Sequence, residues 1–367
     1  MRSTFDEIEK ELNELRDLVR SITPVNSVLE EHKDSLVRQY MTIRRRFDYA
    51  AFAVALYASF EKFIENLVAA YVRLEARRVE YADLPPKLVK KHLSRTAEIL
   101  SRGRLGEGRY AGIRELDVVK NLFECLNGVT PYTLNEAAVV AHDLNLRRGE
   151  IDTLFAAVGI DNVCDRVCRA DALLDWYCTA KDLNAPPQDG VPVTTIEERL
   201  KDIVERRNQV AHRGGNPDDL LGSDKMSDAV GFIEALSKSV FSIAVGRYLH
   251  DHHAAPGQGI QLQQRQDDGP YKNGTVVVVE KPAQRLFVGQ PVFVLIEATG
   301  ARWGRIQSMK VDDTDVRAVE PGTAAANGVG IALDFKCPRG ATLFAIDVDD
   351  DVVWSRVRAQ KRTQGEC

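Results

Sequence analysis

Apolar side chains recur at helical spacing through residues 1–250. The first stripe predicts a helix over residues 1–22. Thr23-Pro24 predicts the end of this helix, because proline lacks an amide hydrogen and its ring clashes with the preceding turn. A second helix is expected over 27–46, ending in Arg44-Arg45-Arg46, and a third over 47–78. The third stripe is the strongest and consists of Phe52, Leu56, Phe60, Phe63, Ile64, Leu67, Val68 and Tyr71.

Shorter helices follow the break at Pro85-Pro86. We expect them over 86–101, 114–127, 133–142, 147–157 and 163–181. A long apolar helix is expected over 225–250. Residues 1–250 therefore predict an all-α domain, with N-terminal helices over 1–46.

The helix that ends near residue 212 has a charge inside its apolar stripe. Thr194 or Thr195 is expected to cap its start, with an acidic residue three positions on, as in a capping box. At about 100° per residue, Arg207 falls near the middle of the stripe. A charge there is unfavourable unless it is paired or faces a wet cleft. The apolar members of the stripe are Ile196, Leu200, Ile203, Val204, Val210 and Ala211.

The same helix end carries an amide and a histidine. Asn208 and His212 are four positions apart, so they share one flank of the helix. Gly214-Gly215 predicts the end of the helix, which puts His212 in the last turn, where the helix dipole favours an imidazolium. Arg207, Asn208 and His212 therefore form a candidate catalytic site. The alternative is a network that only closes the helix end.

The pattern changes to strands at residue 271. Residues 251–270 are rich in Gln, Gly, Asp and Pro and predict an interdomain linker. The region 271–357 predicts a small all-β barrel or sandwich, because short β runs alternate with Gly and Pro. A loose basic tail is expected over 358–367. The expected strands are 275–279, 291–298, 304–311, 329–335 and 341–348.

Composition narrows the class of protein. The chain has 367 residues, 44% hydrophobic and 28% charged, which indicates a globular multidomain α + β protein. Its net charge of −5 argues against nonspecific coating of nucleic acid, although local arginine clusters are present. The longest apolar run, 50–60, is too short to cross a bilayer, and the start has no apolar signal core. We expect a cytoplasmic location.

Metal and nucleotide sites are not favoured by the spacing of candidate ligands. The six cysteines lack paired CxxC spacing and are expected to be reduced structural thiols. The tract His250-Asp251-His252-His253 resembles a metal tract, but a helix end is the simpler interpretation. The glycine-rich loop 103–109 has no preceding strand and no following Gly-Lys-Ser/Thr, so it does not fit a phosphate loop. Arg104 and Arg109 in this loop are candidates for contact with RNA phosphates.

The pattern Arg207-Asn208-x-x-x-His212 at a helix end, inside an all-helical domain, resembles the HEPN superfamily of ribonucleases. An aromatic-rich upstream helix with an internal acid, Tyr57-Ala58-Ser59-Phe60-Glu61-Lys62-Phe63, adds to this resemblance. The segment 144–161 is similar to an insert in HEPN proteins of bacterial abortive-infection and toxin systems. The resemblance covers about residues 30–250.

This resemblance implies a metal-independent endoribonuclease that works as a homodimer without a cofactor. Its implied roles are acid or base for His212, phosphate clamp for Arg207 and orienter for Asn208. Glu61, Arg206 and Arg213 are supporting candidates, and Glu61 is expected to pair with or orient Arg207 if their helices pack. The implied partners are RNA (tRNA, rRNA or mRNA), a second copy, and an antitoxin or regulatory protein in toxin–antitoxin or antiphage defence.

The C-terminal region is similar to the β-barrel second domain of translational GTPases. The similarity lies in residues 305–311, 319–322, 329–333 and 338–343, with no GTPase domain before them. It implies a fold and a docking surface without nucleotide chemistry. Two other functions therefore stay open: a catalytically silent HEPN dimer that acts as a binding module, and a translation-associated binding protein that uses the barrel.

Overall fold

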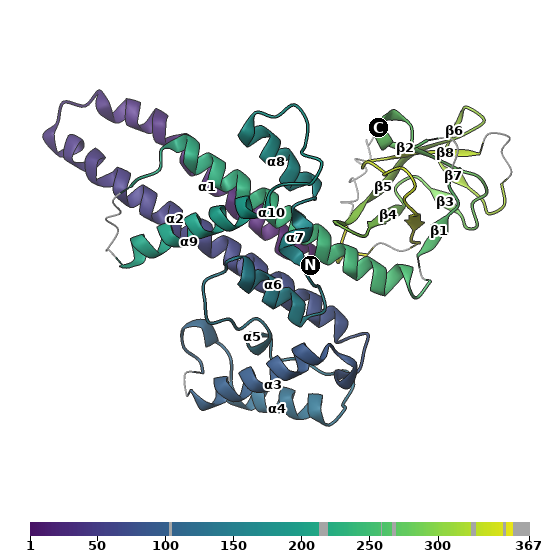
Figure 1. Ribbon diagram of the computed structural model, residues 1–367, viewed down its shortest axis with the longest axis horizontal. Helices are drawn as coiled ribbons and strands as arrows, with labels where there is room; N and C mark the ends of the chain where they lie inside the picture. The colour runs from purple at the N-terminus through teal and green to yellow at the C-terminus, as the bar shows by residue number, and fades with distance from the viewer. Residues whose placement is uncertain are drawn as a thin grey trace, which may run out of the picture. The chain divides into compact units, whose positions relative to one another are not determined.

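The chain divides into a helical unit, Thr4–Ala244, and a strand-rich unit, Val245–Cys367 together with Met1–Ser3 (Figure 1). The computed structural model describes residues 1–102, 105–212, 219–257, 259–265, 269–323, 328–347 and 350–354, without the side chains of Thr42, Arg109 and His212. The architecture is a helical N-terminal region followed by a curled antiparallel sheet, as the sequence predicts.

The two N-terminal helices are longer than their sequence signals predict. α1 (Arg2–Glu30) continues through Pro24, so the predicted end at Thr23-Pro24 is wrong. The buried stripe of α1 finishes at Val19, and the proline ring lies beyond it. α2 (Ser35–Glu75) is one helix where two were predicted. No glycine or proline interrupts it, and Arg44 forms an ion pair with Asp48 one turn on, at 2.9 Å, so the basic triple is accommodated inside the helix.

The remaining helices follow the predicted order with two changes of extent. Only one turn, α5, forms in the predicted helix 133–142, and the predicted helix 163–181 divides into α7 and α8 at Ala170, which has an extended backbone. α9 begins directly after Pro192, so Thr194 and Thr195 lie in its first turn and do not cap it. The elements are η1 (Tyr81–Asp83), α3 (Pro86–Ser101), η2 (Gly108–Tyr110), α4 (Glu115–Leu126), α5 (Glu136–Val139), α6 (Arg148–Ala157), α7 (Val163–Val167), α8 (Asp171–Lys181), α9 (Val193–His212) and α10 (Ser223–Leu249).

The core of the helical unit forms around α10. Phe241 of α10 stacks on Phe5 of α1, with ring centroids 4.5 Å apart, and Phe5 meets Phe63 of α2 edge to face at 6.4 Å. The helical stretch Ser223–Ala254 is long and apolar enough to cross a membrane. Its 18-residue apolar window has a mean hydropathy of 1.4, but 78% of that window is buried inside the protein. Its apolar composition is therefore explained by its place in a protein core.

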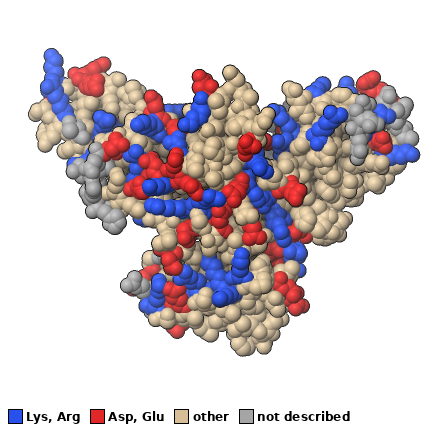
Figure 2. Space-filling view, viewed as in Figure 1, with Lys and Arg blue, Asp and Glu red and all other residues tan. Residues whose placement is uncertain are grey.

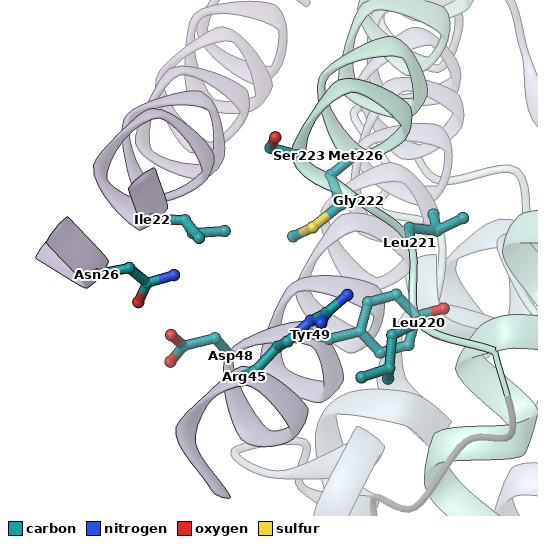
Figure 3. Close-up of a pocket in the computed structure, with 10 residues that line it drawn as sticks. All are labelled: Ile22, Asn26, Arg45, Asp48, Tyr49, Leu220, Leu221, Gly222, Ser223 and Met226. Atoms are coloured by element: carbon teal, nitrogen blue, oxygen red, sulfur yellow. The ribbon is translucent and has the colours of Figure 1, made fainter. Parts of the chain in front are cut away.

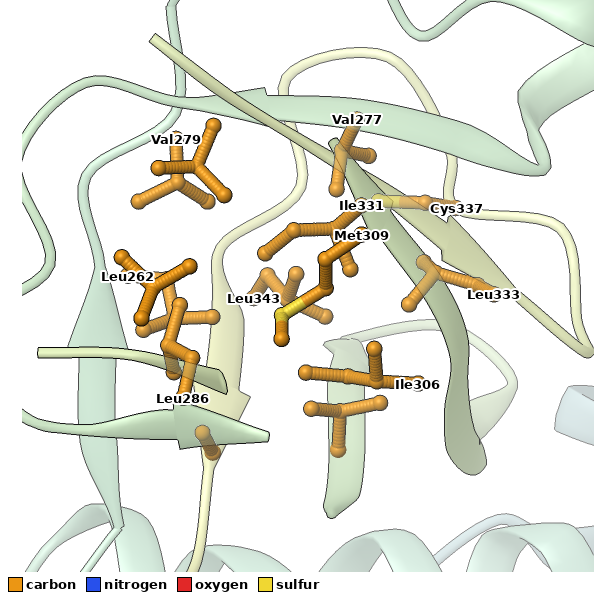
Figure 4. Close-up of a cluster of buried hydrophobic side chains, with 14 of the residues drawn as sticks. Leu262, Val277, Val279, Leu286, Ile306, Met309, Ile331, Leu333, Cys337 and Leu343 are labelled. Carbon is orange, nitrogen blue, oxygen red and sulfur yellow. The ribbon is translucent and has the colours of Figure 1, made fainter. Parts of the chain in front are cut away.

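The strand-rich unit is one curled sheet with a short satellite ladder. Within the described residues the strand order is β1-β9-β4-β5-β8-β2, all antiparallel, with β6 on β5, and β3 pairs with β7. Its inward side chains, among them Ile306, Met309 and Ile331, fill the inside of the curl (Figure 4). The strands are β1 (Ile260–Leu262), β2 (Val276–Val279), β3 (Leu286–Phe287), β4 (Pro291–Ile296), β5 (Gly300–Val311), β6 (Thr314–Val316), β7 (Ala318–Val319), β8 (Val329–Leu333) and β9 (Leu343–Ala345).

The long strand β5 produces the curl. Its first half pairs with β4 and its second half with β8, and a β-bulge separates Ile306 from Ser308. At Gly304 a Cβ atom would overlap the Asp334 carboxylate, which accepts a hydrogen bond from the Arg305 amide at 2.8 Å. The glycine therefore permits the close approach of Asp334 to β5. The two ends of the sheet meet where Gln264, just after β1, bridges to Val279 of β2.

Residues 251–270 were predicted to be an interdomain linker, but they contain a helical turn and a strand of the sheet. A π-helical turn, η3 (His250–Ala254), continues α10, and β1 pairs with β9 as part of the sheet. His253 Nε2 lies 2.8 Å from the Asp350 carboxylate, which also accepts a hydrogen bond from the Tyr248 hydroxyl at 2.7 Å. The histidine tract thus packs into the strand-rich unit. The sequence of this stretch shows no apolar alternation, because the strand β1 has only three residues.

One buried histidine makes the stability of the helical unit pH-dependent. His92 is fully buried, its Nε2 accepts the Asn135 amide at 3.0 Å, and burial lowers its pKa from 6.5 to about 4. Because the unfolded chain takes up the proton near pH 6.5, stability is fully present above that pH and falls as the pH approaches 4. The loss approaches about 3 kcal/mol.

Denaturant titrations of the wild type and His92→Gln at several pH values test this expectation. Glutamine does not take up the proton, so the variant should lose less stability over this window, although it should be less stable at neutral pH. An identical decrease in both proteins would contradict the role of His92.

Candidate active site

Arg207 lies in the interface between α9 and α2. The Arg207 Cζ is 5.2 Å from the centroid of the Tyr57 ring, and Tyr57 is 1% exposed. A guanidinium over an aromatic face is stabilised by the ring quadrupole, more strongly where water is partly excluded. The stripe residue Ala211 is exposed, so the apolar stripe ends sooner than predicted. The ring of Tyr57 explains how a cation is accommodated in the apolar stripe.

Two amide side chains continue from Arg207. Its Nη1 donates a hydrogen bond to Asn208 Oδ1 at 3.0 Å, and Asn145 Nδ2 approaches the same oxygen at 3.5 Å. Asn145 follows the short α5 along the chain and is 63 residues before Asn208. The Asn208 carbonyl oxygen therefore collects two donors, which orients the amide and fixes one edge of the guanidinium.

Tyr57 connects these groups to α2. Its hydroxyl accepts the Leu146 amide at 3.0 Å and donates to Glu61 Oε1 at 2.7 Å. Burial, and then the hydrogen bond to Glu61, raise the pKa of Tyr57 above its usual range. Tyr57 is therefore a neutral donor at physiological pH, with both its ring and its hydroxyl in use.

Glu61 does not pair with Arg207 in the way the sequence analysis expected. Its carboxylate accepts the Tyr57 hydroxyl and lies 3.8 Å from His142 Nε2. Because Glu61 and Tyr57 are one helical turn apart on α2, the acid reaches the hydroxyl while Arg207 takes the ring face. The influence of Glu61 on Arg207 therefore passes through Tyr57.

Arg206 points into a different set of contacts. Its Nε donates to Asp202 at 2.9 Å and its Nη1 to the hydroxyl of buried Tyr49 at 3.1 Å. Burial opposes the charge, but the hydrogen bonds with Asp202 and Tyr49 outweigh it, and the pKa of Arg206 rises above its usual range. Arg206 thus braces α9 against α2 and is not brought together with Asn208.

A cleft of about 300 Å³ lies beyond Tyr49, between α1, α2 and the start of α10. Figure 3 shows Asn26, Arg45 and Asp48 on one side of it and Leu221 and Met226 on the other. Arg207 and Asn208 do not line this cleft. Over the face of the helical unit shown in Figure 2, basic and acidic side chains are intermingled, so binding there depends on local groups.

Four predicted residues cannot be placed by their side chains. His212 is the last described residue of α9, and its side chain lies outside the described atoms, so its predicted place in the last turn stays a prediction. Arg104 and Arg213 lie outside the described residues, and so does the Arg109 side chain.

Three residues of this network were not among the predicted site residues: Tyr57, Asn145 and His142. Tyr57 had a signal, because it precedes Glu61 by one turn on the helix with the strongest stripe. Asn145 and His142 are on a non-helical segment, and no periodicity connects them to α9. Their proximity depends on the tertiary fold.

Removing the Tyr57 hydroxyl should destabilise the helical unit. Tyr57→Phe keeps the ring under Arg207 but leaves the buried Leu146 amide without its acceptor, at a cost of about 1–3 kcal/mol. Urea denaturation measures this loss. Tyr271→Phe is the matched control, because Tyr271 is 44% exposed and lies outside the helical unit, and it should change the unfolding free energy of that unit little. Equal values for the two variants would contradict the hydrogen bonds described.

Comparison with known proteins agrees with the geometry. A family model described as RiboL-PSP-HEPN matches residues 4–245, which is all of the helical unit and more than half of the chain. No curated protein matches the sequence. The HEPN superfamily supplies nuclease and RNA-binding modules, and the Arg207–Asn208 pair at the end of α9 lies inside the matched region. The chain belongs to the RiboL-PSP-HEPN family.

Proposed function

We propose that this protein is a metal-independent endoribonuclease that cleaves RNA through attack of the 2′-hydroxyl. The observation that carries the proposal is the arrangement at the end of α9. Arg207 is held on the Tyr57 ring and hydrogen-bonded to Asn208, and His212 is the last described residue of the same helix. RNA supplies its own nucleophile, so the protein needs only to bind the phosphate and move protons.

Arg207 is the proposed phosphate clamp. A guanidinium binds two phosphate oxygens at once and stabilises the charge that develops on them in the transition state. Asn208 and Tyr57 support this role, because they hold the guanidinium in one orientation before RNA binds. Partial burial strengthens the attraction to the phosphate, since fewer water molecules screen it.

His212 is the proposed acid or base. An imidazole near neutral pH can accept the 2′-hydroxyl proton or protonate the leaving 5′-oxygen, giving a 2′,3′-cyclic phosphate and a 5′-hydroxyl. One helix end carries one histidine, whereas acid and base together require two. A two-fold homodimer supplies the second copy at a composite site.

An exposed apolar stripe on α2 supports the homodimer. Its residues recur at spacings of four, three, four and seven positions, and Tyr57, under Arg207, follows the last of them by three. Phe47 in this stripe is 53% exposed. A second copy packed there would cover the stripe and approach the site from the side of α2. The stripe consists of Leu36, Tyr40, Ile43, Phe47 and Val54.

The biological role is proposed from the superfamily alone. An uncontrolled ribonuclease harms its own cell, so the activity is expected to be held in check by an antitoxin or released by an infection signal. The RNA class is tRNA, rRNA or mRNA. A toxin or antiphage-defence effector fits this behaviour.

A cleavage assay in EDTA tests the nuclease. Wild type should cleave RNA to 2′,3′-cyclic phosphate ends, His212→Ala should lose about 100-fold or more, and Arg207→Lys should lose the bidentate contact and most of the rate. Arg20→Lys, at an exposed position, is the matched control. The proposal fails if wild type leaves all three RNA classes intact under each activating condition, including added phage proteins. A requirement for metal would contradict the mechanism.

Light scattering tests the composite site. Phe47→Asp places a charge in the α2 stripe and should convert a dimer to a monomer and abolish cleavage. Leu116→Asp is the matched control, because Leu116 is 73% exposed on α4, outside the stripe. A wild-type monomer at working concentration, or a cleaving Phe47→Asp monomer, would contradict the composite site.

Binding by the strand-rich unit is the second candidate function. A cleft of about 450 Å³ in this unit is lined by polar side chains that include Gln263, Arg265 and Arg339. Such a cleft suits a hydrogen-bonding ligand on ribosome, tRNA or an elongation factor. Arg339→Glu should then abolish ribosome or tRNA association while RNA cleavage by the helical unit persists. Unchanged association would contradict this role.

A further inference from the structure

The segment 142–146 reaches Arg207 through two contacts. Asn145 Nδ2 approaches the Asn208 oxygen at 3.5 Å, and the Leu146 amide donates to the Tyr57 hydroxyl at 3.0 Å. The segment has no regular secondary structure of its own. Something must therefore hold it against α2 for these two contacts to persist.

His142 fastens this segment to α2. Its side chain is 6% exposed, and its Nε2 lies 2.8 Å from Glu65 Oε1 and 3.8 Å from Glu61 Oε1. Its Nδ1 lies 2.7 Å from the carbonyl oxygen of Leu144 in the same segment. One ring nitrogen thus contacts the carboxylates of α2, and the other closes a tight turn in the segment.

Both nitrogens of His142 face acceptors. A neutral imidazole carries a proton on one nitrogen only, so it can donate one of these hydrogen bonds, whereas an imidazolium donates both. His92 shows the opposite environment, because its Nε2 faces the amide hydrogen of Asn135 and must be unprotonated. The environments of His92 and His142 therefore favour different protonation states.

The charges around His142 favour the imidazolium. From α2, two carboxylates, Glu61 and Glu65, face the ring. The next residue in the chain, Asp143, is paired with Arg95 of α3 at 3.1 Å, and this ion pair also holds the segment. Arg207 of α9 stands on the far side of Tyr57. One positive charge on His142 compensates one of the two facing carboxylates.

We propose that His142, as an imidazolium, is a positioning residue of the Arg207 site. It locks the segment 142–146 on α2, and the lock orients Asn208 through Asn145 and fixes the Tyr57 ring through Leu146. Loss of the proton breaks one of its two hydrogen bonds and loosens both contacts. RNA affinity is therefore highest where His142 is charged and falls as the pH rises. This effect on RNA rests on the proposed nuclease function; the lock itself does not.

The lock is tested without RNA in the full-length protein. Nitrogen NMR should show both ring nitrogens of His142 protonated at neutral pH. His142→Leu should accelerate hydrogen exchange of the Leu146 amide by about tenfold or more, and His142→Lys, which keeps the charge and donors, should restore part of the protection. His32→Leu is the control, because His32 is exposed. A singly protonated ring, or unchanged exchange in His142→Leu, overturns the lock.

A milder variant, Asn145→Ala, keeps the test valid if His142→Leu unfolds the helical unit. Asn145→Ala keeps His142 and its lock, so Leu146 exchange should stay slow while RNA affinity falls. If His142→Leu exposes amides throughout the helical unit, Asn145→Ala and His142→Lys carry the test. An Asn145→Ala protein with wild-type RNA affinity overturns the proposed link to Asn208.

The effect on RNA is measured in the His212→Ala background, where RNA stays intact and His212 no longer titrates. The dissociation constant of a labelled single-stranded RNA should rise about fivefold or more between about pH 6 and about pH 9. Adding His142→Leu should give weak binding that no longer depends on pH. The same pH dependence in both proteins overturns the proposal. No RNA binding by wild type at any pH overturns the nuclease function, while the NMR and exchange results still decide the lock.

Discussion

The organisation of the helical unit depends on placing one cation inside a helix–helix interface. Arg207 lies in an apolar stripe where an isolated charge would be strongly unfavourable. The ring face of Tyr57 stabilises the guanidinium, and the buried tyrosine in turn needs hydrogen-bond partners for its own hydroxyl. The Tyr57 hydroxyl needs a donor and an acceptor, which are Leu146 and Glu61. A non-helical segment is therefore recruited to α2, and it brings Asn145 to Asn208. The burial of Arg207 thus accounts for the hydrogen bonds of the Tyr57 hydroxyl and for the orientation of Asn208.

Much of this arrangement follows from local sequence signals. Periodicity predicts the helical region and the change to strands. Spacing predicts the amide beside the arginine near the end of α9. Errors occurred where a local signal was outweighed by context. Pro24 did not end α1, although the buried stripe of this helix finishes before it, at Val19. Three arginines did not end α2, because an i,i+4 ion pair between Arg44 and Asp48 favours continuation. Short strands such as β1 carry too few residues to show alternation.

The site illustrates the limit of such signals. Arg207 and Asn208 are neighbours on one helix, so their spacing reveals them. Glu61 reaches Arg207 only through Tyr57 and does not pair with it directly, because a helical pattern does not say which atom of a tyrosine faces which neighbour. His142 and Asn145 lie on a segment with no period at all. Only the tertiary packing of α2, α3 and α9 brings them to the site.

The first residues of the chain belong to the strand-rich unit, where the Arg2 amide donates to the Val352 carbonyl at 2.9 Å. In topological terms the helical unit is therefore an insertion within the other unit. Helices form from contacts between near neighbours, whereas this closing contact joins opposite ends of the sequence. During synthesis the helical unit can complete its core while the strand-rich unit still waits for its last strand. The connectivity thus permits the helical unit to form early and the curled sheet to close late.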